Sequence, residues 1–307
     1  MPETADALTD AAGAVVLDLD LGGLALLGAT FDDTQIITRN QGALVQGRGG
    51  YAAFQTCGAR WRLNRRRVNI RVADARTPTI LRNEARPEIG LPAAISVAGA
   101  DGRIRHRVQF LSEADWRVAR AVEAAAVAPP APAPVAERGA DMSNVINLAS
   151  VRNARRNWAG AELGDHLDDI IVGGGAGRAS CLGRLGAAWA RRANPGYLPS
   201  FLSFLCRRGV RFSASVPAAG MLQTLCGRGC ECFGDAEGLM TVLTDRGLFS
   251  IDLAQMAQIW VTRHGGDGGA PGAALELYDA GDRPLAVLHA DPWSEIDGWN
   301  GYLEAMP

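Results

Sequence analysis

The chain contains only four histidines, and one of them, His166, stands in the segment DHLDDIIVGGGAGR at residues 165–178. A neutral imidazole can bind a metal or move a proton near physiological pH. Three glycines after an apolar run can instead form a loop that holds the phosphates of a dinucleotide. The segment therefore permits two kinds of chemistry: a histidine site on a helix, or a dinucleotide site after a strand.

The glycine spacing does not fit a dinucleotide-binding loop. When the pattern G-x-G-x-x-G is counted from Gly173, its third glycine position falls on Arg178, whose bulk would obstruct the packing of helix against strand. The apolar run DIIV is short for a buried strand, and no strand that ends in an acid follows about 20 residues later. A helix is the better interpretation.

The apolar residues of this segment follow a helical stripe. They recur three or four positions apart, at Leu163, Leu167, Ile170 and Ile171. The glycines after Val172 would end the helix, because glycine accepts a positive φ without strain. His166 lies at the border of the stripe, where its ring can face a pocket. On these residues alone, an interfacial histidine without a ligand is the simpler hypothesis.

A second group of chemistry-bearing residues is the cysteine cluster CGRGCEC, with Cys226, Cys230 and Cys232. Tetrahedral zinc usually needs four ligands at paired short spacings, and no histidine follows at finger spacing. We therefore interpret the cluster as part of a strand with small buried residues.

The composition excludes several classes of protein. The 307 residues are 48% hydrophobic with a net charge of -2, so no global basic field attracts nucleic acid or a membrane surface. The acidic start lacks the features of a signal peptide, and no apolar run reaches the roughly 18 residues that span a bilayer. We expect a cytoplasmic protein with reduced cysteines and no membrane insertion.

Arginine supplies all 31 cationic residues, and six of them lie in RWRLNRRRVNIR at residues 60–71. Any anion site must therefore use arginine, histidine or backbone amides. Aromatic residues within the run are limited to Trp61, which argues against a nucleic-acid surface. We interpret the run as a charged strand edge with one inward arginine, Arg71.

An Ala/Pro-rich linker at residues 128–141 divides an N-terminal lobe, residues 1–127, from a C-terminal lobe, residues 142–307. In the first lobe TQIITRN, RVNIRVA, AAISVAG and GRIRHRVQF predict strands, and SEADWRVARAVEAA predicts a helix with a Ser N-cap. In the second lobe, residues 159–208 predict helices, with Leu182, Leu185 and Trp189 on one stripe. Seven strands and a final helix, SEIDGWNGYLEAM, follow.

Two stretches repeat without gaps: residues 94–110 and residues 274–290. Each predicts strand, turn and strand, followed by a helix that contains Trp116 or Trp299. The sequence therefore predicts an α+β fold, a tandem repeat of two antiparallel-sheet units with flanking helices and extra helices at the start of the second unit.

The C-terminal third, AQIWVTRHGGDGGAPGAALELYDAGDRPLAVLHADPWSEIDGWNGYL at residues 257–303, resembles the bacterial hemin-degrading or heme-utilisation proteins, also described as hemin transport proteins. In the N-terminal lobe the resemblance rests on IITRNQGALVQGRGGY, LNRRRVNIRV and DGRIRHRVQF. It covers most of residues 35–127 and 142–307. It implies a tandem-repeat protein that binds heme b in a cleft between the helices and sheets of the C-terminal lobe.

The resemblance also implies roles for single residues. The family's iron ligand is a histidine on the first helix of that lobe, and His166 falls at this place. Arg178 and Arg71 match positions near the heme, where a planar guanidinium suits the heme carboxylates. His264 stands where lysine is common. His289 replaces a tyrosine of the distal side, so we expect it to face the heme opposite His166, as a second axial ligand or as the partner of a bound water.

Other departures concern the first lobe. Val45 stands where some members have a histidine, and the helical prefix of this lobe is largely missing. A carrier tolerates such changes better than an oxygen-activating enzyme. We therefore expect a heme-binding protein that buffers heme or delivers it to a heme acceptor or uptake system for iron utilisation. The alternatives are a heme-degrading oxygenase that uses external electrons, and a non-heme interaction protein on the same scaffold.

Overall fold

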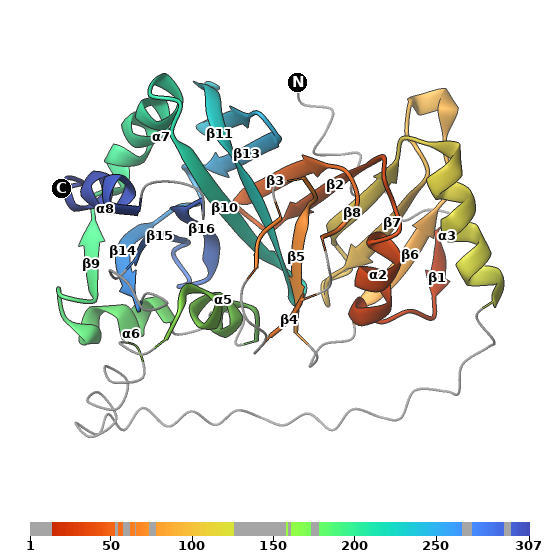
Figure 1. The fold of residues 1–307 in the computed structure, drawn as a ribbon, viewed down its shortest axis with the longest axis horizontal. Coiled ribbons are helices and arrows are strands. Elements are labelled where there is room, and N and C mark those ends of the chain that lie inside the picture. Colours follow the sequence, from red (N-terminus) through yellow and green to blue (C-terminus); the bar gives the residue numbers. More distant parts are fainter. Residues whose placement is uncertain are drawn as a thin grey trace.

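The computed structural model describes residues 14–52, 55–57, 62–64, 66–73, 78–125, 158, 161–172, 178–265, 272–291 and 296–307. The predicted linker at residues 128–141 and the glycines at 173–177 lie outside these ranges. The strands of the two lobes lie at opposite sides of Figure 1, and β3, β10, β11 and β13 meet between them.

The first lobe is built mainly of strands, with two helices. Its elements are β1 (Val15–Leu17), α2 (Leu21–Gly28), β2 (Thr34–Arg39), β3 (Ala43–Arg48), β4 (Gln55–Thr56), β5 (Asn69–Val72), β6 (Thr79–Asn83), the 3-10 turn η1 (Pro87–Ile89), β7 (Ala94–Ala98), β8 (Ile104–Phe110) and α3 (Glu113–Ala125). The four predicted strands and the predicted helix are confirmed. The hydroxyl of Ser112 accepts from the amide of Asp115 at 3.1 Å, as expected of an N-cap.

The second lobe begins with helices and continues as strands. Its elements are α5 (Leu163–Val172), α6 (Arg178–Leu185), β9 (Ala190–Ala193), η2 (Pro195–Tyr197), α7 (Leu198–Arg207), β10 (Arg211–Ala218), β11 (Met221–Gly234), β12 (Leu239–Thr244), β13 (Gly247–Asp252), β14 (Gln258–His264), β15 (Gly272–Tyr278), β16 (Pro284–Ala290) and α8 (Ile296–Glu304). The seven predicted strands and the final helix are confirmed.

The predicted helical stripe through Trp189 is wrong. Helix α6 ends at Leu185, and Gly186 follows with φ of 87°, a left-handed conformation that suits glycine. The next residues form β9, which pairs with β14 and adds a strand to the edge of the sheet. Tertiary pairing overrides the helical spacing here, so helices do not fill the range 159–208 continuously.

The strands follow the order β1-β6-β7-β8-β2-β3-β13-β12-β11-β10-β16-β15-β14-β9, with β5 also paired to β11 and β4 to β5. All the named strand pairs are antiparallel except β4 with β5. The predicted α+β class with antiparallel sheet is therefore confirmed. The two lobes share one hydrogen-bonded arrangement, because β3 of the first lobe pairs with β13 of the second.

The strand order repeats once. In the first lobe the neighbouring strands are β6-β7-β8-β2-β3, and in the second they are β14-β15-β16-β10-β11. In each run three consecutive strands are followed by two consecutive strands from earlier in the same lobe. In both lobes a helix follows the hairpin, and its tryptophan, Trp116 or Trp299, is buried against the sheet. A gene duplication would produce this order, but the tandem origin stays a prediction.

A buried polar chain joins the two lobes. The ring of His106 lies between the hydroxyl of Tyr51, at 2.5 Å from Nε2, and the hydroxyl of Thr38, at 2.6 Å from Nδ1. Thr38 also donates to Gln223 of β11 at 2.6 Å. Burial lowers the pKa of His106 to about 3, so the ring is neutral in the folded protein.

This neutral histidine predicts a dependence of stability on pH. Between about pH 6.5 and 4.5 the unfolded chain binds a proton at residue 106 and the folded chain does not. The contribution of His106 to the free energy of unfolding therefore decreases by about 1.4 kcal/mol for each unit by which the pH is lowered. Urea unfolding of the parent and of His106→Gln at pH 7.5, 6.5 and 5.5 measures this slope. We expect a shallower slope for His106→Gln, whatever its absolute stability. Equal slopes would show that His106 titrates normally.

Candidate functional site

Helix α5 lies against the sheet through the predicted apolar stripe. Its most buried residues, Leu167, Ile170 and Ile171, contact side chains of three different strands: Leu222 of β11, Ala274 of β15 and Val287 of β16. The helix is therefore packed across the junction of β5, β11 and the second-lobe strands, as Figure 1 shows.

A buried ion pair fixes the same helix to the first lobe. The guanidinium of Arg71, only 1% exposed, donates through Nε and Nη2 to the carboxylate of Asp168 on α5, the second contact at 2.6 Å. The prediction that Arg71 points inward is confirmed. Breaking a buried pair by removal of one partner costs about 3 to 5 kcal/mol, so this contact strongly constrains the position of α5.

His166 lies on α5 with 5% of its surface exposed. Its ring packs against that of Trp158 in a tilted arrangement, with 4.1 Å between ring centres. Its Nε2 is buried and has no hydrogen-bond partner among the described residues. Burial and then the charge of Arg178 lower its pKa to about 3. The ring is therefore neutral at pH 7, too weak as a general base, and able to offer a nitrogen lone pair.

Arg178, the first residue of α6, lies beside this ring. Its Nε and Nη2 donate to the two carboxylate oxygens of Glu276 at 2.9 and 2.8 Å. Its Nη2 is 3.5 Å from Nδ1 of His166, and its guanidinium lies 4.7 Å from the ring centre of Trp158. Arg178 thus connects the imidazole to a carboxylate inside the sheet.

Glu276 is a residue that the sequence analysis missed. It lies on β15 at 2% exposure and also accepts from the hydroxyls of Thr262, at 2.9 Å, and Tyr278. Burial opposes its ionisation, but Arg178 and the hydroxyl donors hold its pKa at about 2. The available signal was the single acid inside the apolar strand ALELY, since a buried charge needs a partner.

The other two predicted histidines lie in different surroundings. The ring centre of His264 is 6.4 Å from that of His166, so the structure brings these residues and Arg178 together. His289 is 1% exposed on β16. Its Nε2 is 3.2 Å from the hydroxyl of Ser215, and its Nδ1 is 3.0 Å from the carbonyl oxygen of Ala290. Burial lowers the pKa of both histidines, that of His289 to about 4.

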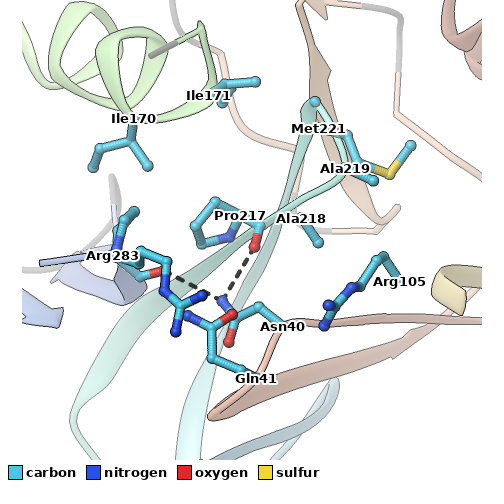
Figure 2. A pocket seen from close by; sticks show the side chains of 12 residues that line it. Asn40, Gln41, Arg105, Ile170, Ile171, Pro217, Ala218, Ala219, Met221 and Arg283 are labelled. Carbon is cyan, nitrogen blue, oxygen red and sulfur yellow. Dashed lines mark hydrogen bonds between the residues drawn. The ribbon is translucent and has the colours of Figure 1, made fainter. Parts of the chain in front are cut away.

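A pocket of about 190 Å³ adjoins the C-terminal half of α5. Figure 2 shows Ile170 and Ile171 at one wall and the β10–β11 hairpin, residues 217–221, at another. The remaining lining residues are Asn40, Gln41, Arg105, Arg283 and Pro284. The amide of Asn40 donates to the carbonyls of Pro217 and Leu285, at 3.1 and 2.7 Å, and so ties the turn after β2 to the end of β10 and the start of β16 at the wall of the pocket.

The described residues hold no group of three or more His, Cys, Asp or Glu side chains arranged to bind a metal ion. All three cysteines of the cluster lie in β11, so the predicted strand is confirmed, but only Cys226 is buried, whereas Cys230 is exposed and Cys232 half-buried. Within the described part of the chain, no helix is long and apolar enough to span a bilayer.

No family model matches the chain, and no curated protein matches it either. Solved structures do. PhuS, a heme-binding protein from Pseudomonas aeruginosa, matches in its holo form with a TM-score of 0.76 and 19% identity, over 96% of this chain and 87% of that chain. ChuS, described as an E. coli heme oxygenase, matches with a TM-score of 0.73 and 16% identity, over 95% of this chain and 88% of that chain.

At these identities the likeness concerns the path of the backbone, and it extends over nearly the whole of both chains. The expected similarity to heme-utilisation proteins is therefore confirmed at the level of structure: the chain has the fold of PhuS and ChuS.

Proposed function

We propose that this protein binds heme and that His166 is the iron ligand. One observation carries the proposal: a neutral, buried imidazole offers an unpartnered Nε2 on the helix that packs across the lobe junction. The fold shared with PhuS, a heme-binding protein, and ChuS, a heme oxygenase, supports the ligand class. When bound, heme would supply a coordinated iron and its porphyrin; the chain supplies the axial nitrogen and the surrounding walls.

The chemistry of the donor set favours heme over a bare metal ion. A bare ion needs three or four protein ligands, and the described residues hold no such group. A porphyrin brings four nitrogens of its own, so one or two imidazoles complete the coordination. His166, next to Trp158 and the apolar stripe of α5, fits this smaller requirement.

Heme entry requires space at α5. Ligand pockets usually enclose about 300 to 1,000 Å³, and the pocket beside Ile170 and Ile171 has about 190 Å³. His166 does not line this pocket, so heme entry would need a shift of α5 that joins the space beside Ile170 and Ile171 to the ring of His166. The apolar contacts of α5 with Ala274 and Val287 are those that a porphyrin face could replace.

Arg178 remains our candidate for a heme carboxylate, through one edge of its guanidinium. Removing it from Glu276 would leave a buried carboxylate unpaired, at a cost of about 3 to 5 kcal/mol. A new charged hydrogen bond returns about 1.5 to 3 kcal/mol. We therefore propose that the pair with Glu276 persists. The Nη1 atom is the one available for a heme carboxylate, since it faces Asp169 at 3.6 Å and that side chain is 72% exposed.

Arg71 also forms a buried ion pair, but its proposed role differs from that of Arg178. Its pair with Asp168 holds α5, the helix of His166, so Arg71 acts on heme first through the position of that helix. A direct contact with a heme carboxylate stays a prediction. The Nη1 atom of Arg71 already donates to Oε1 of Gln55 at 3.5 Å, so a heme carboxylate would have to displace a partner.

For the opposite face of the iron, we propose His264 ahead of His289. The rings of His166 and His264 lie near one another, with 6.4 Å between their centres, so both imidazoles could hold the same heme after a rearrangement of α5. His289 would first have to leave Ser215 and the Ala290 carbonyl. Two axial imidazoles favour a carrier, because they fill the coordination sphere and hinder oxygen binding.

Carriage of heme b, as a buffer or for delivery to an acceptor or uptake system in the cytoplasm, is therefore the function we propose. The second candidate is heme cleavage with external electrons, because ChuS, which has the same fold, is described as a heme oxygenase. Heme cleavage requires an iron with one open axial position.

Replacement of His166 tests its role as the proposed iron ligand. His166→Ala should remove the imidazole-type absorption spectrum of added hemin and weaken hemin binding at least about tenfold, or 1.4 kcal/mol. His106→Gln, which alters a histidine in the first-lobe core, is the matched control and should keep both. An unchanged hemin spectrum in His166→Ala would contradict the assignment.

Asp169 tests the carboxylate contact without breaking a buried pair. Asp169→Asn removes an exposed negative charge beside Nη1 of Arg178, so a heme carboxylate should bind more favourably. We expect hemin affinity to rise about two- to fivefold, in keeping with the 0.2–1 kcal/mol of an exposed pair. Asp297→Asn on α8 controls for the change in net charge. Unaltered affinity in Asp169→Asn would mean that the heme carboxylates lie elsewhere.

Electron paramagnetic resonance of the ferric complex decides the second axial ligand. We predict a low-spin signal in the parent and in His289→Ala, and a high-spin signal in His264→Ala.

Addition of ascorbate under air should leave the heme spectrum of the parent intact. A high-spin parent that loses its heme spectrum with ascorbate would instead support the oxygenase.

A further inference from the structure

A second pocket, of about 30 Å³, lies on the sheet where one edge of β11 changes partner. On this edge β5 pairs with Met221–Thr224, and β12 pairs from Gly229 onward. Between them β11 has a strand partner only on its other edge, β10. The pocket occupies this gap and shares no lining residue with the surroundings of His166. Its walls are Gly47, Arg48, Arg66, Arg67, Val68, Gln223, Thr224, Leu225, Cys226 and Arg246.

The lining contains four arginines and no acidic residue. They come from three separate places: Arg48 ends β3, Arg66 and Arg67 precede β5, and Arg246 lies in the turn between β12 and β13. Long-range folding therefore gathers the charges, and two of them belong to the arginine run that the heme site leaves unexplained. Arg48 and Arg67 pair with carboxylates outside the lining, so the net positive charge at the pocket comes mainly from Arg66 and Arg246, and a bound anion would reduce their repulsion.

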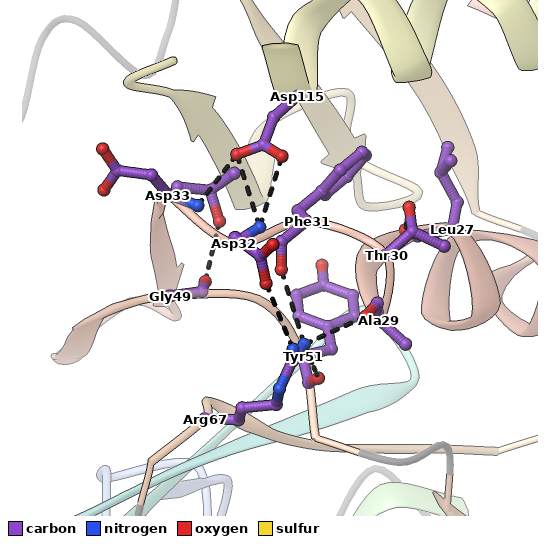
Figure 3. A network of polar contacts seen from close by, with 11 residues as sticks. Leu27, Ala29, Thr30, Phe31, Asp32, Asp33, Gly49, Tyr51, Arg67 and Asp115 are labelled. Carbon is purple, nitrogen blue, oxygen red and sulfur yellow. Dashed lines mark hydrogen bonds and ion pairs between the residues drawn. The ribbon is translucent and has the colours of Figure 1, made fainter.

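Two of the four are held in place by the protein. Figure 3 shows the guanidinium of Arg67, which donates to the carbonyl oxygen of Ala29 at 2.9 Å and to the carboxylate of Asp32 at 3.2 Å. Arg48 pairs with Asp33 at 2.8 Å. The backbone contact of Arg67 orders that side chain before any ligand arrives, which lowers the entropic cost of binding, whereas the pair of Arg48 is exposed and constrains it less.

The other two carry uncompensated charge. Among the described residues, no acidic side chain forms an ion pair with the guanidinium of Arg66 or of Arg246, and both residues are exposed. An arginine fork pairs bidentately with the oxygens of a phosphate or carboxylate. The two side chains reach the pocket from opposite chain segments, so a single anion between them offsets both charges.

The size of the pocket limits the anion. A volume of about 30 Å³ exceeds the roughly 10–15 Å³ that a cavity needs to hold one water molecule, so the pocket admits a small polar group and not an extended body. Gly47 keeps this depth open, since a Cβ there would lie 3.0 Å from Cγ2 of Val68. A compact tetrahedral anion would place one oxygen inside and present the others to the guanidiniums at the rim.

We propose that this pocket binds a phosphate group, either free inorganic phosphate or the end of a small phosphate monoester. Arg66 and Arg246 are its main charged ligands, and Arg48 and Arg67 complete the rim. The site is independent of the heme proposed above.

Thermal unfolding with added inorganic phosphate tests the proposal, with sodium chloride at the same ionic strength as the reference. A ligand that binds the folded state raises Tm in a saturable way. The parent should show such a rise with phosphate and not with chloride. Arg66→Gln/Arg246→Gln should reduce phosphate affinity at least about tenfold. Arg103→Gln/Arg117→Gln, which removes two exposed charges elsewhere, should retain it.

Glycerol 3-phosphate identifies the source of the phosphate group. A saturable shift with this monoester, also lost in Arg66→Gln/Arg246→Gln, assigns the site to a phosphorylated metabolite. A shift with inorganic phosphate alone assigns it to the free ion. Equal effects of phosphate and chloride on the parent, or an equal phosphate shift in both double variants, would overturn the proposal. Neither result bears on hemin binding.

Discussion

The buried carboxylate of Glu276 is the constraint on which the candidate site depends. A carboxylate at 2% exposure needs strong donors, and Arg178, Thr262 and Tyr278 provide them. This requirement fixes the first residue of α6 against β15. The fixed guanidinium in turn lies beside His166, lowers its pKa and helps to keep the imidazole neutral. The ring of His166 is neutral chiefly because it is buried, and the charge of Arg178 lowers its pKa further.

The position of α5 follows from a second buried pair, Arg71 with Asp168, which crosses from the first lobe to the second. The site is therefore composite: one lobe supplies the anchor and the other supplies the imidazole and its surroundings. Apolar contacts to Leu222, Ala274 and Val287 close the rest of the helix face. Exchange of apolar contacts for a porphyrin costs less than separation of either ion pair. The balance favours opening along the apolar face of α5.

Sequence reasoning predicted the elements whose signal is local. The hairpins that end in β8 and β16, the N-cap at Ser112 and the stripe of α5 each carry a period or a turn residue of their own. Helix α2, LGGLALLG, was missed because three glycines and uniform apolarity hide any helical period. Strand β9 exists because β14 offers an edge. Glu276 was passed over because its partner stands 98 positions away, a distance that no local pattern spans.

The central claim is that a single heme binds through an imidazole at α5. Titration of the unmodified chain with hemin, followed by absorption spectroscopy, tests it most directly. We expect saturation at one hemin per chain, with the spectrum of iron coordinated by histidine. Hemin that adds without saturation, or that saturates without an imidazole-type spectrum, would contradict a heme site at His166 and favour an interaction protein on this scaffold.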